Sequence, residues 1–306
     1  NHCDHCYNEP ERKSVRSMSL EEWQQVIDKL FDLGLPYLIL TGGEPSRLPH
    51  ILEIIEYAAA KGMVVGMNSH GRRFADEEFA RQAKEAGLDN LQITLASHLS
   101  DLHDQIVGAD AFKETTQGIR NAIEAGIHTI TNTTLVKSNQ AYVPELIAFL
   151  HNLGVRTFAL NSLISSGKGA EFEEGISFLE AEKCLTMAKA HAHENGMTFL
   201  WYTPSEYCNF SPITAGVGIK RCNAAEYSMC IEPDGSVIPC QSFYEPVGNF
   251  LRDDWEKIWN SKLFQTIRER TSNLDAICND CPDIELCAGG CYLDRYAQKP
   301  KVTWNC

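Results

Sequence analysis

Cysteines grouped toward the two ends of the chain constrain this 306-residue sequence more than any other feature. There are twelve, and several stand in C-x-x-C pairs, such as Cys3 with Cys6 and Cys278 with Cys281. Short secreted chains that lack a core use cysteines at this density for disulfides. This chain is long enough to bury a large core, and no apolar stretch of an export signal opens it. The sequence therefore predicts metal ligation.

Helical and strand patterns alternate between Ser19 and about Trp201. The run Ser19-Leu20-Glu21-Glu22 is a capping box that predicts the start of a helix, and Gly34 marks its end. A long helix is expected over residues 178–195. Strands are expected at residues 37–41, 63–67, 91–95, 128–131, 157–160 and 197–202. Strand–helix–strand units at this spacing predict a parallel sheet.

Six strands are too few for a full eight-stranded barrel. We therefore predict an α/β fold in which residues 1–202 form a partial (β/α)6 TIM-like barrel, with a first strand that would precede Asn1. Residues 203–220 are expected to be a linker. Residues 221–306 are expected to form a small cysteine-rich domain with one helix at 253–270. Because this segment has little core of its own, clusters or metal would hold it together.

Two motifs lie where loops should leave the first strands of the barrel. One is the pair Cys3 and Cys6. The other is Thr41-Gly42-Gly43-Glu44-Pro45, whose glycines allow a ligand close to the backbone and whose carboxylate suits a cationic group. Together they resemble the radical S-adenosylmethionine (SAM) family, whose signature is C-x3-C-x-φ-C followed by a GGE-type strand end. The first cysteine of that signature would lie four residues before Cys3, ahead of Asn1.

The resemblance implies a [4Fe–4S] cluster on three thiolates, with one iron left for SAM. Reductive cleavage of SAM would give a 5′-deoxyadenosyl radical that abstracts hydrogen from a substrate. Gly42, Gly43 and Glu44 would hold the SAM amino group, and His5 would lie against the adenine. Further polar residues at strand ends would face the same cavity, each with loop capping as the alternative: Asn68, Thr94, Ser97, Asn132, Thr134 and Asn161.

The C-terminal cysteines have a more specific spacing. Cys222-x12-Gly235-x4-Cys240 precedes Cys278-x2-Cys281-x5-Cys287-x3-Cys291 and then Cys306. This resembles the SPASM extension, the twin-cluster domain of peptide- and protein-modifying radical SAM enzymes. It implies two auxiliary [4Fe–4S] clusters. One would be held by Cys222, Cys240, Cys291 and Cys230, with Cys208 as the alternative fourth ligand, and the other by Cys278, Cys281, Cys287 and Cys306.

The metal at the C-terminal cysteines has an alternative, and Cys184 has a separate interpretation. Zinc also takes four thiolates from C-x-x-C pairs, so it is the alternative metal for the C-terminal segment. Cys184 lies inside a helical pattern among apolar neighbours, which predicts a buried core thiol without a chemical role.

We therefore predict a radical SAM oxidoreductase that matures a peptide or cofactor, modifying a peptide or protein substrate. Tetrapyrrole side-chain tailoring is one alternative, because the run Asn161–Gly169 resembles a loop of haem-pathway relatives. A non-catalytic zinc-binding interaction module is the other. An electron donor such as flavodoxin or ferredoxin and a cytoplasmic location are expected. The net charge of −14 argues against nucleic acid and membrane partners, and no apolar run reaches the roughly 20 residues that span a bilayer.

Overall fold

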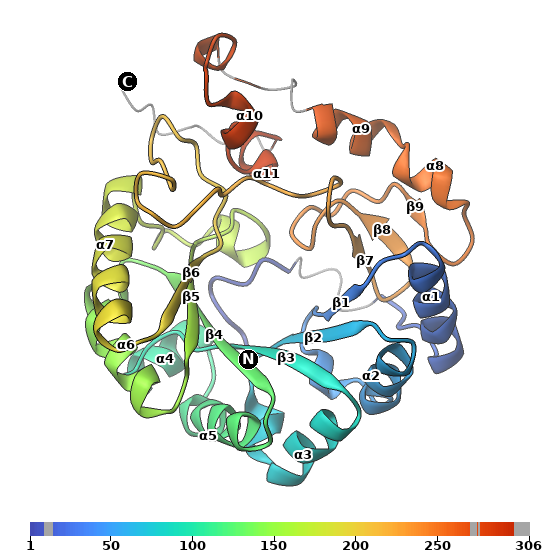
Figure 1. Ribbon diagram of the computed structural model, residues 1–306, viewed down its shortest axis with the longest axis horizontal. Helices are drawn as coiled ribbons and strands as arrows, with labels where there is room; N and C mark the ends of the chain where they lie inside the picture. Colours follow the sequence, from blue (N-terminus) through green and yellow to red (C-terminus); the bar gives the residue numbers. More distant parts are fainter. Residues whose placement is uncertain (9–14, 270–273, 275, 297–306) are drawn as a thin grey trace.

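The computed structural model describes residues 1–8, 15–269, 274 and 276–296. Its main feature is a six-stranded parallel sheet, in the order β1-β2-β3-β4-β5-β6, that curves into an open barrel (Figure 1). Each predicted strand overlaps an observed one, so the predicted α/β partial barrel is confirmed. The strands are β1 (Tyr37–Leu40), β2 (Val64–Ser69), β3 (Leu88–Thr94), β4 (His128–Leu135), β5 (Thr157–Ser162) and β6 (Thr198–Trp201).

Helices cover the outer face of this sheet (Figure 1). They begin where local sequence predicts: the Ser19 hydroxyl accepts from Glu22 N at 3.3 Å, and the Glu22 carboxylate accepts from Ser19 N at 2.8 Å. Ser177 caps the last helix of the barrel in the same way. The helices are α1 (Leu20–Asp32), α2 (Ile51–Ala60), α3 (Glu77–Glu85), α4 (Ser100–Val107), α5 (Phe112–Glu124), α6 (Val143–Asn152) and α7 (Phe178–Glu194).

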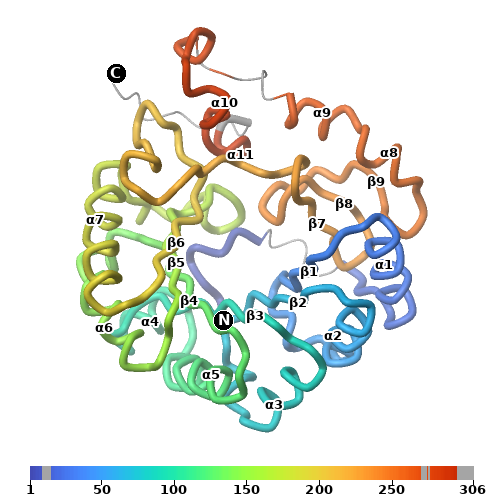
Figure 2. Tube along the Cα trace, viewed as in Figure 1, coloured from blue at the N-terminus to red at the C-terminus, as the bar shows by residue number. Residues whose placement is uncertain are grey.

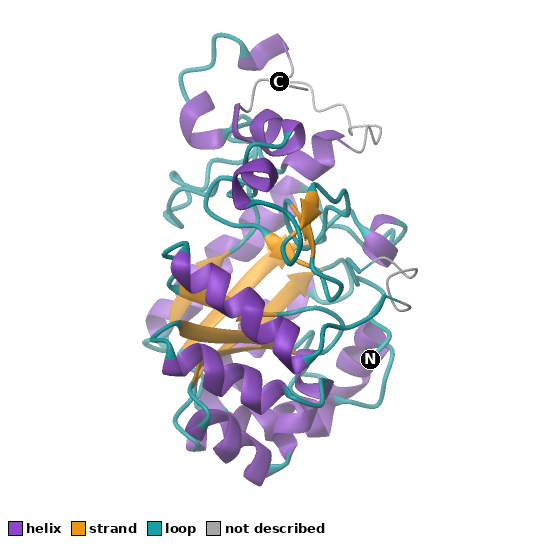
Figure 3. Ribbon diagram, turned by 90° about the vertical axis from the view of Figure 1, so that its right-hand side faces the viewer, coloured by secondary structure: helices purple, strands orange, loops and turns teal. Residues whose placement is uncertain are grey.

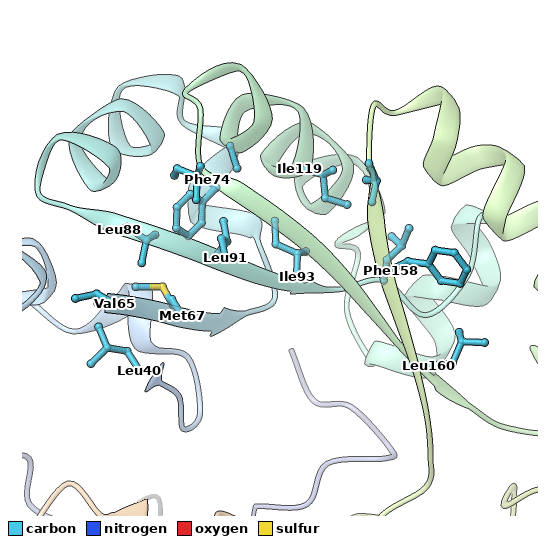
Figure 4. Close-up of a cluster of buried hydrophobic side chains, with 14 of the residues drawn as sticks. Leu40, Val65, Met67, Phe74, Leu88, Leu91, Ile93, Ile119, Phe158 and Leu160 are labelled. Atoms are coloured by element: carbon cyan, nitrogen blue, oxygen red, sulfur yellow. The ribbon is translucent and has the colours of Figure 1, made fainter. Parts of the chain in front are cut away.

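The core fills the space between sheet and helices, and strand alternation decides which side chains enter it. Leu88, Leu91 and Ile93 of β3 are fully buried and lie against Phe74 and Ile119 (Figure 4). Successive strand residues point to opposite faces, so Gln92 and Thr94, which alternate with Leu91 and Ile93 after a register irregularity near Leu88, point into the barrel. The polar side chains at the strand ends therefore share the concave face.

Three short antiparallel strands form a second sheet in the C-terminal segment: β7 (Cys230–Ile231), β8 (Ser236–Ile238) and β9 (Gly248–Asn249). Short helices follow it: α8 (Trp255–Trp259), α9 (Lys262–Glu269), α10 (Ile284–Cys287) and α11 (Tyr292–Tyr296). Within the described ranges, no helix is both long enough and apolar enough to cross a membrane.

The prediction of one continuous helix over 253–270 is wrong up to residue 269, and residue 270 lies outside the described residues. The chain leaves the helical path at Asn260, where α8 ends and α9 begins two residues later. This break lets the Trp259 ring meet the Phe264 ring edge-on, with centroids 5.8 Å apart. Arg268 then stacks on Trp259 and donates to its carbonyl at 2.6 Å. These contacts between the two helices take the place of the backbone hydrogen bonds that one continuous helix would make at this point.

The C-terminal segment packs directly on the barrel and lies beyond one end of it (Figure 3). Lys29 of α1 donates to the Phe250 carbonyl at 2.9 Å and to the Asp253 carbonyl at 2.8 Å. Met18 N donates to the Pro233 carbonyl at 2.7 Å. Buried residues of the small sheet, including Val237, belong to the same apolar core as the barrel. The two parts are therefore firmly joined.

Candidate functional site

The N-terminal segment with the first cysteine pair runs through the centre of the ring of strands (Figure 2). Backbone hydrogen bonds fix it to the end of α4: His2 N donates to the Val107 carbonyl at 2.9 Å, and Asp4 N donates to the Ile106 carbonyl at 3.1 Å. Parallel barrels carry their active sites at the carboxyl ends of the strands. Cys3 and Cys6 are therefore held across that mouth.

The next two residues tie this segment to the end of β1. The Tyr7 hydroxyl lies 3.4 Å from Thr41 Oγ1, and Asn8 Nδ2 donates to the Gly42 carbonyl at 3.0 Å. The structure thus brings the cysteine pair and the glycine-rich strand end together. Among the described residues other than the adjacent ones, no atom lies within 4 Å of the position that a Cβ would take at Gly42 or Gly43. Their backbone faces open space in which a ligand can approach.

The glycine-rich run after β5 clamps the cysteine segment from the other side. Gly169 N donates to the Cys6 carbonyl at 3.1 Å, and Lys168 Nζ donates to the His2 carbonyl at 3.1 Å. A Cβ at Gly167 would lie 2.6 Å from the Asn8 carbonyl oxygen, so only glycine allows this close approach. The run that resembles a haem-pathway loop therefore has a structural task in this chain.

Gly167→Ala should disturb this clamp strongly. The new methyl would collide with Tyr7 and Asn8 backbone atoms, and the left-handed backbone at φ +52° adds strain. We expect the variant to hold about four iron atoms fewer per chain, the content of one [4Fe–4S] cluster at Cys3 and Cys6. Iron and sulfide analysis measures this. Gly126→Ala, at φ +77° with open space around it, should keep the parent's iron; an iron-replete Gly167→Ala would contradict the clamp.

Glu44 is buried, with 8% of its side chain exposed, and its carboxylate accepts from several donors. Oε1 accepts from the Ser46 hydroxyl at 2.6 Å and from the Ser69 hydroxyl at 2.8 Å, while Oε2 accepts from His70 N at 2.8 Å. Burial lowers the pKa of the His70 imidazole, although the nearby Glu44 carboxylate opposes the shift. The network fixes the direction of the carboxylate at the strand end.

Five of the predicted polar residues lie on the concave face of the sheet. Strand register places Thr94 beside Asn132 and Thr134 beside Asn161. Asn161 Nδ2 donates to Thr134 Oγ1 at 3.2 Å. The fifth is Asn68, near the end of β2.

Ser97, the sixth, has a different position. It lies in the loop after β3, is almost fully buried, and its hydroxyl accepts from Leu99 N at 3.1 Å. It caps a loop in the structure, which is the alternative role that sequence leaves open for such residues.

Two buried polar atoms near the mouth have no hydrogen-bond partner among the described residues: His5 Nδ1 and Asn132 Oδ1. Burial lowers the pKa of His5 to about 4, so the imidazole is neutral at pH 7. An unsatisfied buried polar atom costs about 1–3 kcal/mol. Together with the open space at Gly42 and Gly43, these atoms fit a polar ligand such as SAM.

Several thiols from one predicted ligand set lie near enough to one another for their charges to interact. Burial raises the pKa of Cys3 to about 11, and the neighbouring Cys6 thiol adds to the shift. Burial likewise raises the pKa of Cys240 to about 11, with Cys222 contributing. Burial raises the pKa of Cys291 far above its usual range, and charges on Asp294, Cys222 and Cys240 add to this. Buried thiols favour the thiolate once a cation binds them.

Cys222, Cys240 and Cys291 therefore lie in the same neighbourhood. Cys230, on β7, lies close enough for its charge, like that of Cys240, to raise the pKa of buried Tyr7, although burial is the main cause. Cys208 is exposed in the segment before them. Across the described ranges, no three His, Cys, Asp or Glu side chains already converge with metal-binding geometry.

The second predicted set lies in the turns around α10. Cys281 N donates to the Cys278 carbonyl at 3.3 Å, and buried Cys287 Sγ accepts from Tyr207 N at 3.3 Å. Cys306 lies outside the described residues. The eleven described cysteines form no disulfide with one another, as expected for metal ligation. Cys184 is a buried core thiol on α7, as predicted.

Sequence patterns alone missed three polar residues at this site. Ser46 and His70 hold the Glu44 carboxylate together with Ser69, a strand-end residue that the sequence pattern includes, and Asn8 bridges the cysteine segment to Gly42. Ser46 follows Glu44 by two residues, a spacing at which side-chain caps are common, so it could have been found. The others depend on contacts between distant parts of the chain.

Two family models match the chain. The radical SAM superfamily matches residues 1–150, and the SPASM iron–sulfur cluster-binding domain matches residues 222–282. Their positions correspond to the barrel with the first cysteine pair and to the cysteine-rich segment.

Curated relatives match over nearly the whole chain. Mycofactocin maturase MftC of Mycobacterium ulcerans is 26% identical, covering 96% of this chain and 80% of its own length. The subtilosin biosynthesis protein AlbA of Bacillus subtilis, a bacteriocin pathway protein, is 26% identical, with coverage of 99% and 68%. An AdoMet-dependent haem synthase of Oleidesulfovibrio alaskensis is also 26% identical, with coverage of 94% and 78%.

A solved structure shares the fold across both parts of the chain. SuiB of Streptococcus suis, bound to its precursor peptide SuiA, superposes with a TM-score of 0.77 at 17% identity. The match covers 97% of this chain and 70% of that one. The barrel and the C-terminal segment therefore have the same arrangement in both proteins.

Proposed function

Since this chain belongs to the radical SAM superfamily and carries a SPASM iron–sulfur cluster-binding domain, we propose that its substrate is a peptide or protein. The chain is a radical SAM enzyme, and its cofactors are [4Fe–4S] clusters and SAM. The observation that carries the proposal is the position of Cys3 and Cys6 against the Gly42–Glu44 strand end, in a fold shared with a peptide-bound relative.

We assign the N-terminal cluster to Cys3 and Cys6, with a further cysteine expected ahead of Asn1. One auxiliary cluster takes Cys222, Cys240, Cys291 and Cys230, with Cys208 as the alternative to Cys230. The other takes Cys278, Cys281, Cys287 and Cys306. The assigned SAM contacts are His5, Gly42, Gly43, Glu44, Asn68, Thr94, Ser97, Asn132, Thr134 and Asn161, of which Ser97 has the weakest support because it caps its own loop.

The bound cluster and SAM supply a carbon radical that takes hydrogen from the substrate. The protein's residues have other tasks. Glu44, held by Ser46 and Ser69, offers a fixed carboxylate to the SAM ammonium group. Neutral His5 and the amide of Asn132 each offer a buried polar atom that has no hydrogen-bond partner among the described residues.

Three similarities support a peptide substrate. The SuiB structure contains a precursor peptide, AlbA acts in bacteriocin biosynthesis, and MftC is a maturase. Tetrapyrrole tailoring remains the second candidate, supported by the similarity to haem synthases.

We also propose a low-potential electron donor such as flavodoxin or ferredoxin. A cytoplasmic location agrees with thiolates that must stay reduced.

The test uses the full-length protein, reconstituted with iron and sulfide without oxygen. It is incubated with SAM, a reductant and peptides encoded beside its gene, and 5′-deoxyadenosine and peptide mass are followed. We expect SAM-dependent 5′-deoxyadenosine and a mass change in one peptide. A mass change in a porphyrin precursor, with every peptide intact, would favour the second candidate. Colourless protein that carries zinc and cleaves no SAM would refute both.

A further inference from the structure

A chain of side-chain hydrogen bonds joins the C-terminal domain to the strand end with Gly42. The Tyr244 hydroxyl donates to Asn8 Oδ1 at 2.8 Å, and Asn8 Nδ2 donates to the Gly42 carbonyl at 3.0 Å. Tyr244 and Asn8 are 236 positions apart in the sequence. The bridge therefore forms only when the barrel and the C-terminal domain are packed together.

The carbonyl at the end of this bridge belongs to a weakly packed peptide. Gly42 has φ +133°, a conformation that side chains disfavour, and the Cβ positions of Gly42 and Gly43 face open space. The Gly42 carbonyl and the Gly43 N–H lie in one planar peptide group. By holding the carbonyl, Asn8 sets the direction of that whole group, including the Gly43 N–H, which points the opposite way in a trans peptide.

Tyr244 is placed in turn by the proposed auxiliary-cluster cysteines. Phe243 N donates to the Cys240 carbonyl at 3.0 Å, so the chain turns tightly between the cysteine and the tyrosine. The buried Phe243 ring stacks on Tyr292, with centroids 6.1 Å apart, and Tyr292 directly follows Cys291. Two proposed ligands of one auxiliary cluster thereby determine where the Tyr244 hydroxyl lies.

We infer that Tyr244 and Asn8 are positioning residues through which the auxiliary domain sets the affinity of the barrel for SAM. Tyr244 acts through Asn8, and Asn8 acts through the Gly42–Gly43 peptide. The inference rests on the proposed function, in which this peptide and Glu44 bind the amino-acid end of SAM. It gives the auxiliary domain a task at the SAM site in addition to holding clusters.

The experiment compares reconstituted full-length protein with Tyr244→Phe, which loses only the hydroxyl. We expect the Kd for SAM to rise about fivefold, the usual worth of one hydrogen bond. The change that SAM causes in the EPR spectrum of the reduced N-terminal cluster should need correspondingly more SAM. Iron content should equal the parent's. Tyr227→Phe, changed at a tyrosine that is 77% exposed in the same domain, should bind SAM like the parent.

A second variant tests whether Tyr244 acts through Asn8. Asn8→Asp can still accept from Tyr244 but cannot donate to the Gly42 carbonyl, so we expect SAM affinity to fall about tenfold or more. Adding Tyr244→Phe to Asn8→Asp should cause no further loss, because the tyrosine acts only through residue 8. Parental SAM affinity in Tyr244→Phe, or additive losses in the double variant, would overturn the inference. A parent that binds SAM but modifies no peptide would refute only the proposed substrate.

Discussion

Cys240→Ser should lower the iron content by about four atoms per chain and stop peptide modification, while SAM cleavage continues. A serine hydroxyl is a poor ligand for iron in a cluster, because it is harder and far less acidic than a thiol. We propose that an auxiliary cluster held by Cys240 would accept the electron left on the substrate radical. Without it, 5′-deoxyadenosine should still form, but modified peptide should fall at least about 100-fold, as measured by mass spectrometry.

The surroundings of Cys240 make this variant informative. The partly buried thiol lies near those of Cys222 and Cys291, so its loss takes one of the proposed ligands away from the other two. Phe243 belongs to the common core and holds the same turn. We therefore expect the C-terminal domain to become more sensitive to protease, because cluster binding contributes to its folding.

Cys184→Ser is the matched control for this prediction. That thiol is also shielded from solvent, more completely than Cys240, but it lies on α7 in the barrel core and belongs to neither proposed ligand set. The substitution should cost stability without changing iron content or peptide product. Equal iron in Cys240→Ser and the parent would remove Cys240 from the ligand set. Loss of iron in Cys184→Ser would show that the assay reports folding instead of ligation.

Local patterns were sufficient to predict the barrel. The capping box at Ser19 and the apolar runs of β1 and β5 depend on neighbouring residues, so they are visible before any tertiary contact is known. Position at the strand ends predicted polar residues for the same cavity, and period-two alternation in the structure explains why several of them share the concave face. Asn132 and Thr134 follow this rule, since both lie on β4 with one residue between them.

Three features of the structure were not predicted, because the contacts that produce them are not contained in the sequence patterns. The break at Asn260 depends on Trp259 meeting Phe264 and Arg268 across two helices, which a helical pattern over 253–270 does not contain. Tyr244 joins Asn8 only after the C-terminal domain docks on the barrel. Ser97 is a residue type that can contact a ligand, but its hydroxyl accepts a hydrogen bond from Leu99 N within its own loop.

Glu44→Gln should weaken SAM binding about 100-fold. The variant loses the charge-assisted contact with the SAM ammonium group, which is worth about 1.5–3 kcal/mol. It also meets a conflict inside the protein, because both carboxylate oxygens already accept hydrogen bonds from fixed donors. A glutamine has one oxygen, so its NH2 group must point either at Ser46 N, which donates to Oε1 at 3.1 Å, or at His70 N, which donates to Oε2. One donor then faces another in a buried site.

The two causes can be separated by measurement. Equilibrium binding of SAM to reconstituted protein reports the lost ammonium contact, while urea unfolding of protein without SAM reports the internal conflict, expected at about 1–3 kcal/mol. Ser69→Ala removes one donor and keeps the charge, so SAM affinity should fall only about fivefold. Glu53→Gln, with 52% of that side chain exposed on α2, should change neither quantity. If Glu44→Gln bound SAM as tightly as the parent, the ammonium group would have to be held elsewhere, and the assignment of the β1 strand end to SAM would fail.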